Sequence, residues 1–164
     1  MIAARVEAFL AEHPEVTVVS MVHNETTTGI LNDVESVGRV VKAAGRTFVV
    51  DAMSSFGAVD IRVADIGIDY LVSSANKCIQ GVPGFSYIIA RREALEATEG
   101  NARTVSLDLY DQWKGLEEGH GKWRFTSPTH VVAAFHRAMQ ELREEGGGRP
   151  CLVFFAGNCK SYQF

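Results

Sequence analysis

The spacing of apolar residues along this chain predicts an alternation of helices and strands. Apolar side chains three or four residues apart indicate a helix face, and short runs rich in valine and isoleucine indicate buried strands. The expected helices span residues 2–12, 33–44, 61–66, 92–99, 104–117 and 127–144. The expected strands span residues 16–22, 47–50, 69–73 and 85–90, and the last of them could run antiparallel.

The segment from residue 16 to residue 50 has the layout of a strand–helix–strand unit. Its first strand leads into a polar loop, residues 23–29. Asn32 is the expected N-cap of the helix, with Glu35 completing a capping box, and Gly45 lies where glycine often ends a helix. Because two strands joined through a crossover helix run in the same direction, we expect a parallel pair here.

This alternation predicts an α/β fold, with a mostly parallel sheet flanked by helices. Ligands of such sheets bind outside the carboxyl ends of the strands. The loops that follow the first three expected strands leave from that edge, and they carry Thr26, Asp51 and Lys77. Three polar side chains are therefore expected on one rim of the sheet.

Composition narrows the class of protein without identifying a ligand. The 164 residues suffice for one domain with a core, and 46% are hydrophobic and 22% charged, as in soluble globular proteins. A net charge of −4 without a basic run argues against nucleic acid or an anionic membrane surface as the main partner. The sequence shows neither a signal-peptide layout nor an apolar run of the roughly 20 residues that a membrane helix needs.

Cysteines and histidines add little chemistry to this picture. The three cysteines are odd in number and lack CxxC spacing, which indicates reduced thiols and a cytoplasmic protein. The five histidines are not spaced as metal ligands, so we expect no metal site.

A lysine and an aspartate at the ends of two buried strands form the pair that a pyridoxal 5′-phosphate (PLP) enzyme needs. The lysine amine forms a Schiff base with the cofactor aldehyde, and the carboxylate keeps a proton on the pyridine nitrogen. Partial burial would free the amine of Lys77 for attack on a carbonyl. Each residue also has an ordinary interpretation, Lys77 as a surface lysine in a loop and Asp51 as the cap of a turn or helix.

Two threonines are further candidates. The hydroxyl of Thr26, in a triple-threonine loop, could bond the phenolic oxygen of a cofactor or cap its own loop. Thr126 precedes Ser127-Pro128 at the start of the long helix, where free N–H groups and the helix dipole favour a phosphate. An ordinary N-cap is the alternative for Thr126, and the local sequence favours it.

Long ordered strings surround these candidates, and together they resemble a known family. The resemblance is to the 2-aminoethylphosphonate–pyruvate transaminases, a branch of the class V, fold type I PLP-dependent aminotransferases. It runs from about Val16 to Gly147. The strings that carry it are His23–Asn32, Val50–Gly57, Ser73–Gly84, Ser106–Trp113 and Lys122–His130.

The resemblance implies a role for each candidate near the rim. Lys77 matches the Schiff-base lysine, and Asp51 matches the aspartate that pairs with the pyridine nitrogen. Thr26 matches the position whose hydroxyl meets the phenolic oxygen of the cofactor. Met53 matches a residue that packs against the ring, and Asn76 falls where relatives place a polar side chain on the phosphate.

The resemblance also implies a homodimer and a reaction. Thr126 matches a residue that reaches the phosphate of the neighbouring subunit. The implied activity belongs to phosphonate catabolism: the amino group of 2-aminoethylphosphonate moves to pyruvate through the lysine–PLP Schiff base, giving phosphonoacetaldehyde and L-alanine. Two alternatives stay open, another class V transaminase of the alanine–glyoxylate or serine–pyruvate type, and a non-catalytic truncated fragment.

The length of the chain departs from the family pattern. Family members carry an N-terminal phosphate-binding loop and a C-terminal domain with an arginine for the substrate, and neither is expected here. Residues 1–148 are therefore expected to form part of the large domain, and residues 149–164 a divergent C-terminal tail. We expect this fragment to bind PLP poorly.

Overall fold

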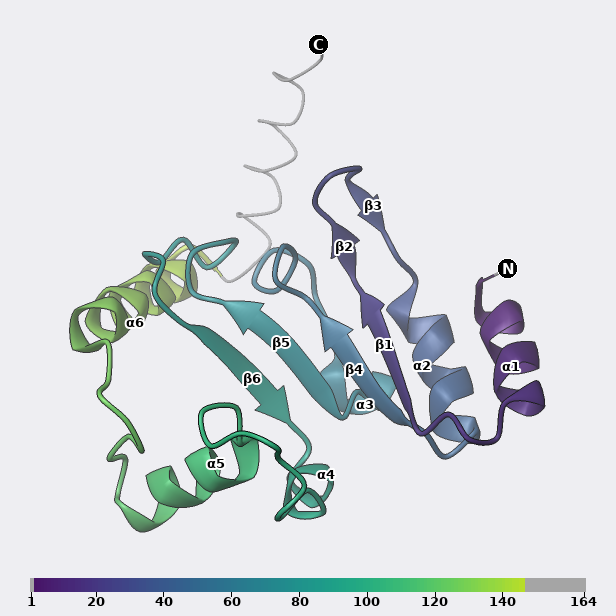
Figure 1. Cartoon of the computed structure of the whole chain (residues 1–164). Coiled ribbons are helices and arrows are strands. Elements are labelled where there is room, and N and C mark those ends of the chain that lie inside the picture. Colours follow the sequence, from purple (N-terminus) through teal and green to yellow (C-terminus); the bar gives the residue numbers. More distant parts are fainter. Residues whose placement is uncertain (1, 147–164) are drawn as a thin grey trace.

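The computed structural model describes residues 2–146, and a four-stranded sheet lies at its centre (Figure 1). The strand order is β1-β4-β5-β6, and β1 and β5 both run parallel to β4. β6 returns antiparallel beside β5 through residues 75–85, so the expected α/β fold with an antiparallel last strand is confirmed. The strands are β1 Val18–Val22, β4 Thr47–Asp51, β5 Tyr70–Ser74 and β6 Ser86–Ala90.

Six helices lie where the apolar spacing predicts them, with shorter ends in places. They are α1 Ile2–Glu12, α2 Val34–Ala43, α3 Val63–Ile66, α4 Arg92–Glu96, α5 Leu109–Glu118 and α6 Thr129–Glu144. The polar loop after β1 holds a feature that was not predicted, a small antiparallel hairpin of β2 Asn24–Glu25 and β3 Ile30–Leu31. Strands of two residues are too short to show alternation in a sequence.

The core lies between one face of the sheet and the helices α1, α2 and α3 (Figure 1). Every second residue of β4 points to this side, so Phe48 and Val50 are buried, and Leu71 of β5 joins them. α2 contributes Val37 and Val41 from one helix face. This packing fixes β4, which ends at Asp51, and β5, whose following loop carries Lys77.

The opposite face of the sheet is only partly covered. At its β1 end, Val18 is 51% exposed and Val22 is 38% exposed. Near its other end, a groove of about 830 Å³ lies between β6 and α5, with Ile88 and Trp113 in its lining. Asp51 belongs to this open face, because it pairs with Val22 in register and alternates with the buried Val50.

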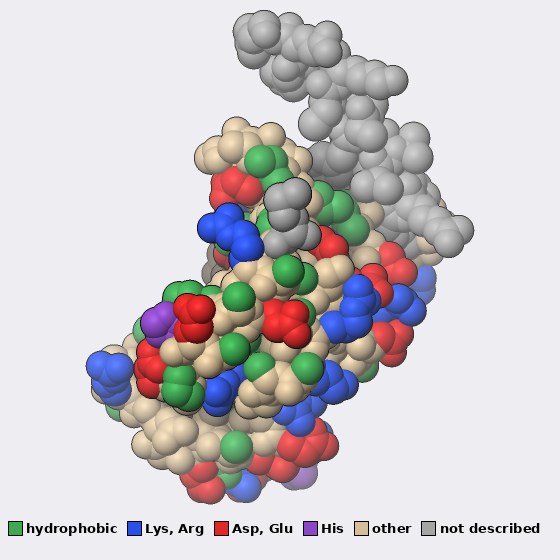
Figure 2. Space-filling model, turned by 90° about the vertical axis from the view of Figure 1, so that its right-hand side faces the viewer, with side chains coloured by type: hydrophobic (Ala, Val, Ile, Leu, Met, Phe, Trp, Pro, Cys, Tyr) green, Lys and Arg blue, Asp and Glu red, His purple; other side chains and the backbone are tan. Residues whose placement is uncertain are grey.

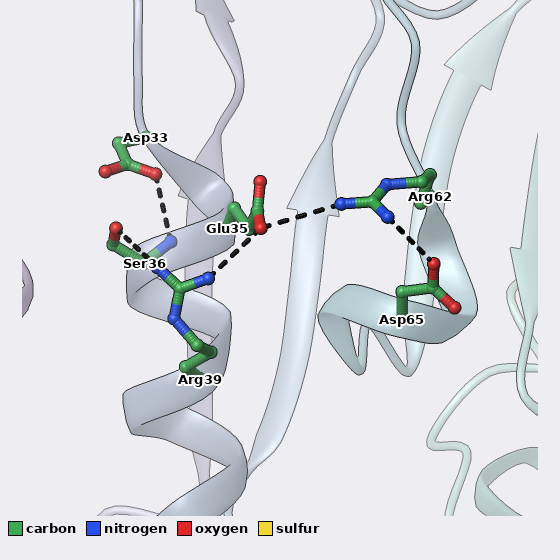
Figure 3. A network of polar contacts seen from close by, with 6 residues as sticks. All are labelled: Asp33, Glu35, Ser36, Arg39, Arg62 and Asp65. Atoms are coloured by element: carbon green, nitrogen blue, oxygen red, sulfur yellow. Dashed lines mark hydrogen bonds and ion pairs between the residues drawn. The ribbon is translucent and has the colours of Figure 1, made fainter.

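The N-cap of α2 differs from the predicted one by one residue. Asp33, not Asn32, accepts the Ser36 amide at 2.9 Å (Figure 3). The Asn32 side chain instead donates to the Val22 carbonyl at 2.9 Å, which ties the hairpin to the end of β1. The predicted capping box is therefore wrong.

Glu35 takes part in a surface network in place of that box. Its carboxylate lies 3.1 Å from Arg39 and 3.7 Å from Arg62, which also pairs with Asp65 at 3.3 Å (Figure 3). All four side chains are more than half exposed, so we expect each pair to contribute about 1 kcal/mol or less. The network links α2 to α3 without setting the fold.

The surface of the described residues carries mixed charge. Acidic and basic side chains are interspersed over the face seen in Figure 2. Among residues 2–146, no helix is both long and apolar enough to cross a lipid bilayer. The tail expected at residues 149–164, and its boundary with the part before it, lie outside the described residues.

Candidate active site

Three candidate residues follow three neighbouring parallel strands. Thr26 lies in the hairpin after β1, Asp51 is the last residue of β4, and Lys77 lies in the loop after β5. Because these strands run parallel, their loops leave the sheet at the same edge, at the top in Figure 1. The sheet therefore gathers the three loops as the alternation of helices and strands predicts, while their chemical roles stay predictions.

The backbone after β4 holds the Asp51 carboxylate in place. Its Oδ1 accepts the Met53 amide at 2.9 Å, and the Asp51 carbonyl accepts the His23 amide at 2.8 Å. The following turn closes with the Ser55 and Phe56 amides both donating to the Ala52 carbonyl. Asp51 is half-buried, so the carboxylate is fixed at the strand tip and still reaches solvent.

Ser54 joins the three loops. Its hydroxyl lies 2.5 Å from the Thr26 hydroxyl, and its carbonyl accepts the Cys78 thiol at 3.4 Å. Cys78 is buried and directly follows Lys77, so the lysine loop rests on the turn that Asp51 begins. The loops that carry Thr26, Asp51 and Lys77 are thus joined through Ser54 into one cluster.

The lysine loop is folded back on itself. Gly81 donates to the Ala75 carbonyl at 2.8 Å, and a Cβ on Gly81 would lie 2.6 Å from that same oxygen. Gln80 donates to the Lys77 carbonyl at 2.9 Å and has a positive φ of 63°. Only glycine fits at residue 81, because a side chain there would clash with the Ala75 carbonyl.

The lysine itself is open to solvent. Lys77 and Asn76 are both exposed, as in the ordinary interpretation of Lys77 as a surface lysine in a loop, and the partial burial that would free the amine is not seen. The apolar strand before the loop ends at Ser74, and the loop projects from the sheet edge. The amine is consequently accessible to a carbonyl compound from solution.

His23 and Ser55 form a buried pair that sequence reasoning missed. Ring Nδ1 of His23 lies 2.9 Å from the Ser55 hydroxyl, and the two residues are 4% and 1% exposed. Burial lowers the pKa of His23, which favours the neutral ring. A hydrogen bond between residues so far apart in the chain leaves no local signal in the sequence.

The residues at the rim fit PLP. A primary amine and a carboxylate are both solvent-accessible on one edge, and Met53 is half-buried beside the carboxylate. The Ser74 hydroxyl, at the end of β5, is buried without a hydrogen-bond partner among the described residues. A bound polar group would satisfy that hydroxyl.

Thr126 lies apart from this cluster. It is exposed and lines the groove between β6 and α5, together with Trp123 and Phe125. The N-cap of α6 is Pro128, so the interpretation of Thr126 as an ordinary N-cap is wrong. Among residues 2–146, no cluster of three or more His, Cys, Asp or Glu side chains could hold a metal ion.

Curated relatives match most of this chain. A 2-aminoethylphosphonate–pyruvate transaminase from Bacteroides fragilis is 60% identical over 142 residues, which cover 87% of this chain and 39% of the relative. A protein of the same name from Vibrio vulnificus is 58% identical over the same share. The chain spans about two fifths of the length of the curated relatives it matches.

Two solved structures with a similar fold are named as aminotransferases. A pyridoxamine–pyruvate aminotransferase from Mesorhizobium loti has a TM-score of 0.79 and 28% identity, over 88% of this chain and 37% of that one. An alanine–glyoxylate aminotransferase from Nostoc has a TM-score of 0.80 and 24% identity, over 96% and 42%, and supports the fold alone.

The family follows from the sequence together with this architecture. The sequence model described as Aminotransferase class-V matches residues 4–146, which is nearly the whole of the described chain. The parallel sheet and the rim of Thr26, Asp51 and Lys77 are the part of the fold that this match covers. The chain belongs to the class-V aminotransferase family.

Proposed function

We propose that this chain carries the PLP-attaching part of a 2-aminoethylphosphonate–pyruvate transaminase. In that reaction the amino group of 2-aminoethylphosphonate moves to pyruvate, giving phosphonoacetaldehyde and L-alanine. The contact of Ser54 with both the Thr26 hydroxyl and the Cys78 thiol carries the proposal, because it joins the three loops of the site. Relatives of that name at 55–60% identity support the choice of substrates.

Lys77 and Asp51 have the two central roles in this proposal. Lys77 Nζ would attach to the cofactor aldehyde and, once displaced by the amino substrate, would move a proton at the substrate carbon. Asp51 would hold a proton on the pyridine nitrogen, and its bond from the Met53 amide keeps the carboxylate oriented for this. When bound, PLP supplies a sink for the electrons released at that carbon.

Three further residues would hold the ring and its substituents. Thr26 would bond the phenolic oxygen, and Ser54 keeps its hydroxyl in place. Met53 would pack against the ring, and Asn76, exposed beside Lys77, would bond the phosphate. These assignments rest on the family resemblance and on the position of each residue at the same rim.

A homodimer belongs to the proposal because of Thr126. This residue lies on the groove between β6 and α5, while the lysine and aspartate lie at the carboxyl edge of the sheet. Thr126 would therefore serve the phosphate bound by a second subunit. We place the protein in the cytoplasm, where its cysteines would stay reduced.

Attachment of PLP to Lys77 is the first test of this function. The chain is mixed with PLP, reduced with borohydride, and digested for mass spectrometry. We expect the added mass on the peptide that contains Lys77 and its loss in Lys77→Ala. Lys122→Ala, which removes an exposed lysine outside the site, is the matched control and should keep the label. Equal labelling of the wild type and Lys77→Ala would refute the cofactor role.

The choice of substrate needs a second assay. Alanine formation from pyruvate is measured with 2-aminoethylphosphonate, and the rate is compared with the rates for serine as donor and for alanine with glyoxylate. Preference for the phosphonate is the expected result. Preference for serine or alanine would point to another class V transaminase, and a folded chain without turnover would indicate a non-catalytic piece.

A further inference from the structure

The buried His23–Ser55 pair lies next to the Asp51 backbone, at the end of β4. His23 is the first residue after β1, and its amide donates to the Asp51 carbonyl at 2.8 Å. The His23 carbonyl accepts the backbone N–H of Asn32 at 2.7 Å, at the base of the hairpin that carries Thr26. One residue therefore connects the end of β4 with the hairpin.

The His23 ring adds a second link, to the turn after Asp51. Nδ1 lies 2.9 Å from the Ser55 hydroxyl. The Ser55 carbonyl in turn accepts the Ala58 and Val59 amides at 3.0 and 2.9 Å, so Ser55 is fixed from both sides of the turn. The backbone of His23 holds the start of this turn, and its ring holds the middle.

The turn between these two links contains the groups that face the site. Met53 donates to Asp51 Oδ1, and Ser54 contacts Thr26 and Cys78. If Ser55 moved, the Met53 amide and the Ser54 carbonyl would move with it, since they lie within two residues. The position of the carboxylate relative to the lysine loop thus depends on a pair that does not itself reach the rim.

Resting on the proposed function, we propose that His23 and Ser55 are positioning residues, which set the Asp51 carboxylate against Lys77 for PLP binding. The ring is well suited to this because His23 is 4% exposed and Ser55 is 1% exposed, so water does not compete for their bond. Breaking this bond would leave a buried polar group without a partner, and that costs more free energy than a hydrogen bond contributes on average. The penalty keeps the turn in one arrangement.

Hydrogen exchange of the cofactor-free chain tests the first half of this proposal. The Met53 amide reports on its bond to Asp51, and NMR follows its exchange rate. We expect exchange about tenfold faster in His23→Leu and Ser55→Ala, with little change at the Val50 amide in the strand. His120→Asn, at an exposed histidine, is the control and should leave Met53 unchanged. An unchanged Met53 rate in both site variants would overturn the proposal.

Cofactor affinity tests the second half. PLP should bind about tenfold more weakly to His23→Leu and Ser55→Ala, which corresponds to the coupling expected for residues in one network. His23→Asn should recover most of this loss, because an asparagine amide occupies the place of Nδ1. In an Asp51→Asn background the effect of His23→Leu should vanish; an effect of undiminished size would mean a general structural role and would refute positioning.

The two proposals fail in different ways. If the wild-type chain takes up no PLP at Lys77, the proposed function fails for this chain. The Met53 exchange rate still decides whether His23 and Ser55 position Asp51, because it is measured without cofactor.

Discussion

Asp69 holds three strands together with one carboxylate. Oδ2 accepts the Phe48 amide of β4 at 2.8 Å, and Oδ1 lies 2.7 Å from Nε and Nη2 of Arg91, just after β6. Asp69 precedes β5 and is 6% exposed. It is placed at the amino end of the parallel strands, opposite the candidate site, so its role is structural.

Removing this carboxylate should destabilise the fold. We expect Asp69→Ala to lower the free energy of unfolding by about 2–4 kcal/mol, because a buried amide and a guanidinium lose their acceptor. Urea denaturation followed by circular dichroism measures this. Asp65→Ala removes an exposed carboxylate that pairs with Arg62, and should change the free energy by about 0.5 kcal/mol or less. Equal effects of the two changes would contradict this account of Asp69.

The buried ring of His23 should make stability depend on pH. Its pKa in the folded chain is lowered by burial from the ordinary value of 6.5. The unfolded chain then binds a proton that the folded chain does not, so stability is complete above about pH 6.5 and declines as the pH falls below it.

Denaturant unfolding at pH 7 and at pH 5 measures this contribution. We expect the wild type to lose more stability between these values than His23→Asn, which cannot take up the proton. His120→Asn, at an exposed site, should decline with pH as the wild type does. A decline of equal size in the wild type and His23→Asn would show that the ring adds nothing.

At the scale of elements, α2 packs against α3 without room for a side chain. A Cβ on Gly38 would lie 2.6 Å from Ile66 Cγ2 and 2.8 Å from the Ile66 carbonyl. In α5, a Cβ on Gly115 would meet its nearest neighbour, Arg124 Cβ, at 3.9 Å. A side chain would therefore clash at Gly38, whereas Gly115 has room for one.

These glycines give a matched pair of substitutions. Gly38→Ala should destabilise by about 1–3 kcal/mol, because the clash exceeds the gain in helix propensity. Gly115→Ala should stabilise by about 0.5–1 kcal/mol, since only the propensity changes. Thermal unfolding measured by circular dichroism distinguishes them, and a stabilising Gly38→Ala would mean that α2 and α3 are not in close contact.

The sequence predicts these elements well where a pattern is long enough to repeat. The four strands of the main sheet and the six helices follow from apolar spacing, and the shared edge of Thr26, Asp51 and Lys77 follows from parallel pairing. The β2–β3 hairpin does not, because two residues show no period. The choice between Asn32 and Asp33 as N-cap depends on one residue of register, which local sequence does not decide.

The candidate site shows the same limit. Lys77 and Asp51 can be named as candidates because Asp51 ends an apolar run and Lys77 lies in the loop that follows one. Ser54, Ser55 and His23 instead act through contacts between loops that are distant in sequence. Such contacts depend on how β1, β4 and β5 are stacked side by side. Their partners can be named only when the three-dimensional arrangement is known.

At the scale of the whole molecule, one face of the sheet stands out. Parallel sheets are usually covered on both sides, yet Val18, Val22 and Ile88 are exposed on this one. The chain also spans about two fifths of its relatives. An uncovered apolar surface of this kind binds hydrophobic dyes.

Dye binding measures how open this face is in solution. The chain should enhance the fluorescence of anilinonaphthalene sulfonate. The enhancement should be smaller in the double variant Val18→Thr/Ile88→Thr, because threonine keeps the β-branched shape and puts a hydroxyl in place of an apolar group. Val41→Thr, at a fully buried position on α2, should destabilise the fold by about 1–3 kcal/mol and is the contrasting change. Absence of dye binding by the folded wild type would show that the face is covered in solution.

The antiparallel return of β6 has a consequence for how this protein can vary. Residues 75–85 connect strands that lie side by side with Ser74 facing Ser86, and the bond from the Gly81 amide to the Ala75 carbonyl holds the lysine loop between them in one arrangement. A single inserted residue next to Lys77 would have to bulge outward, or it would turn Tyr87 and every other side chain of β6 over to the opposite side. Natural variants should therefore keep the spacing of this hairpin fixed and accept insertions elsewhere, for instance in the stretch before α5.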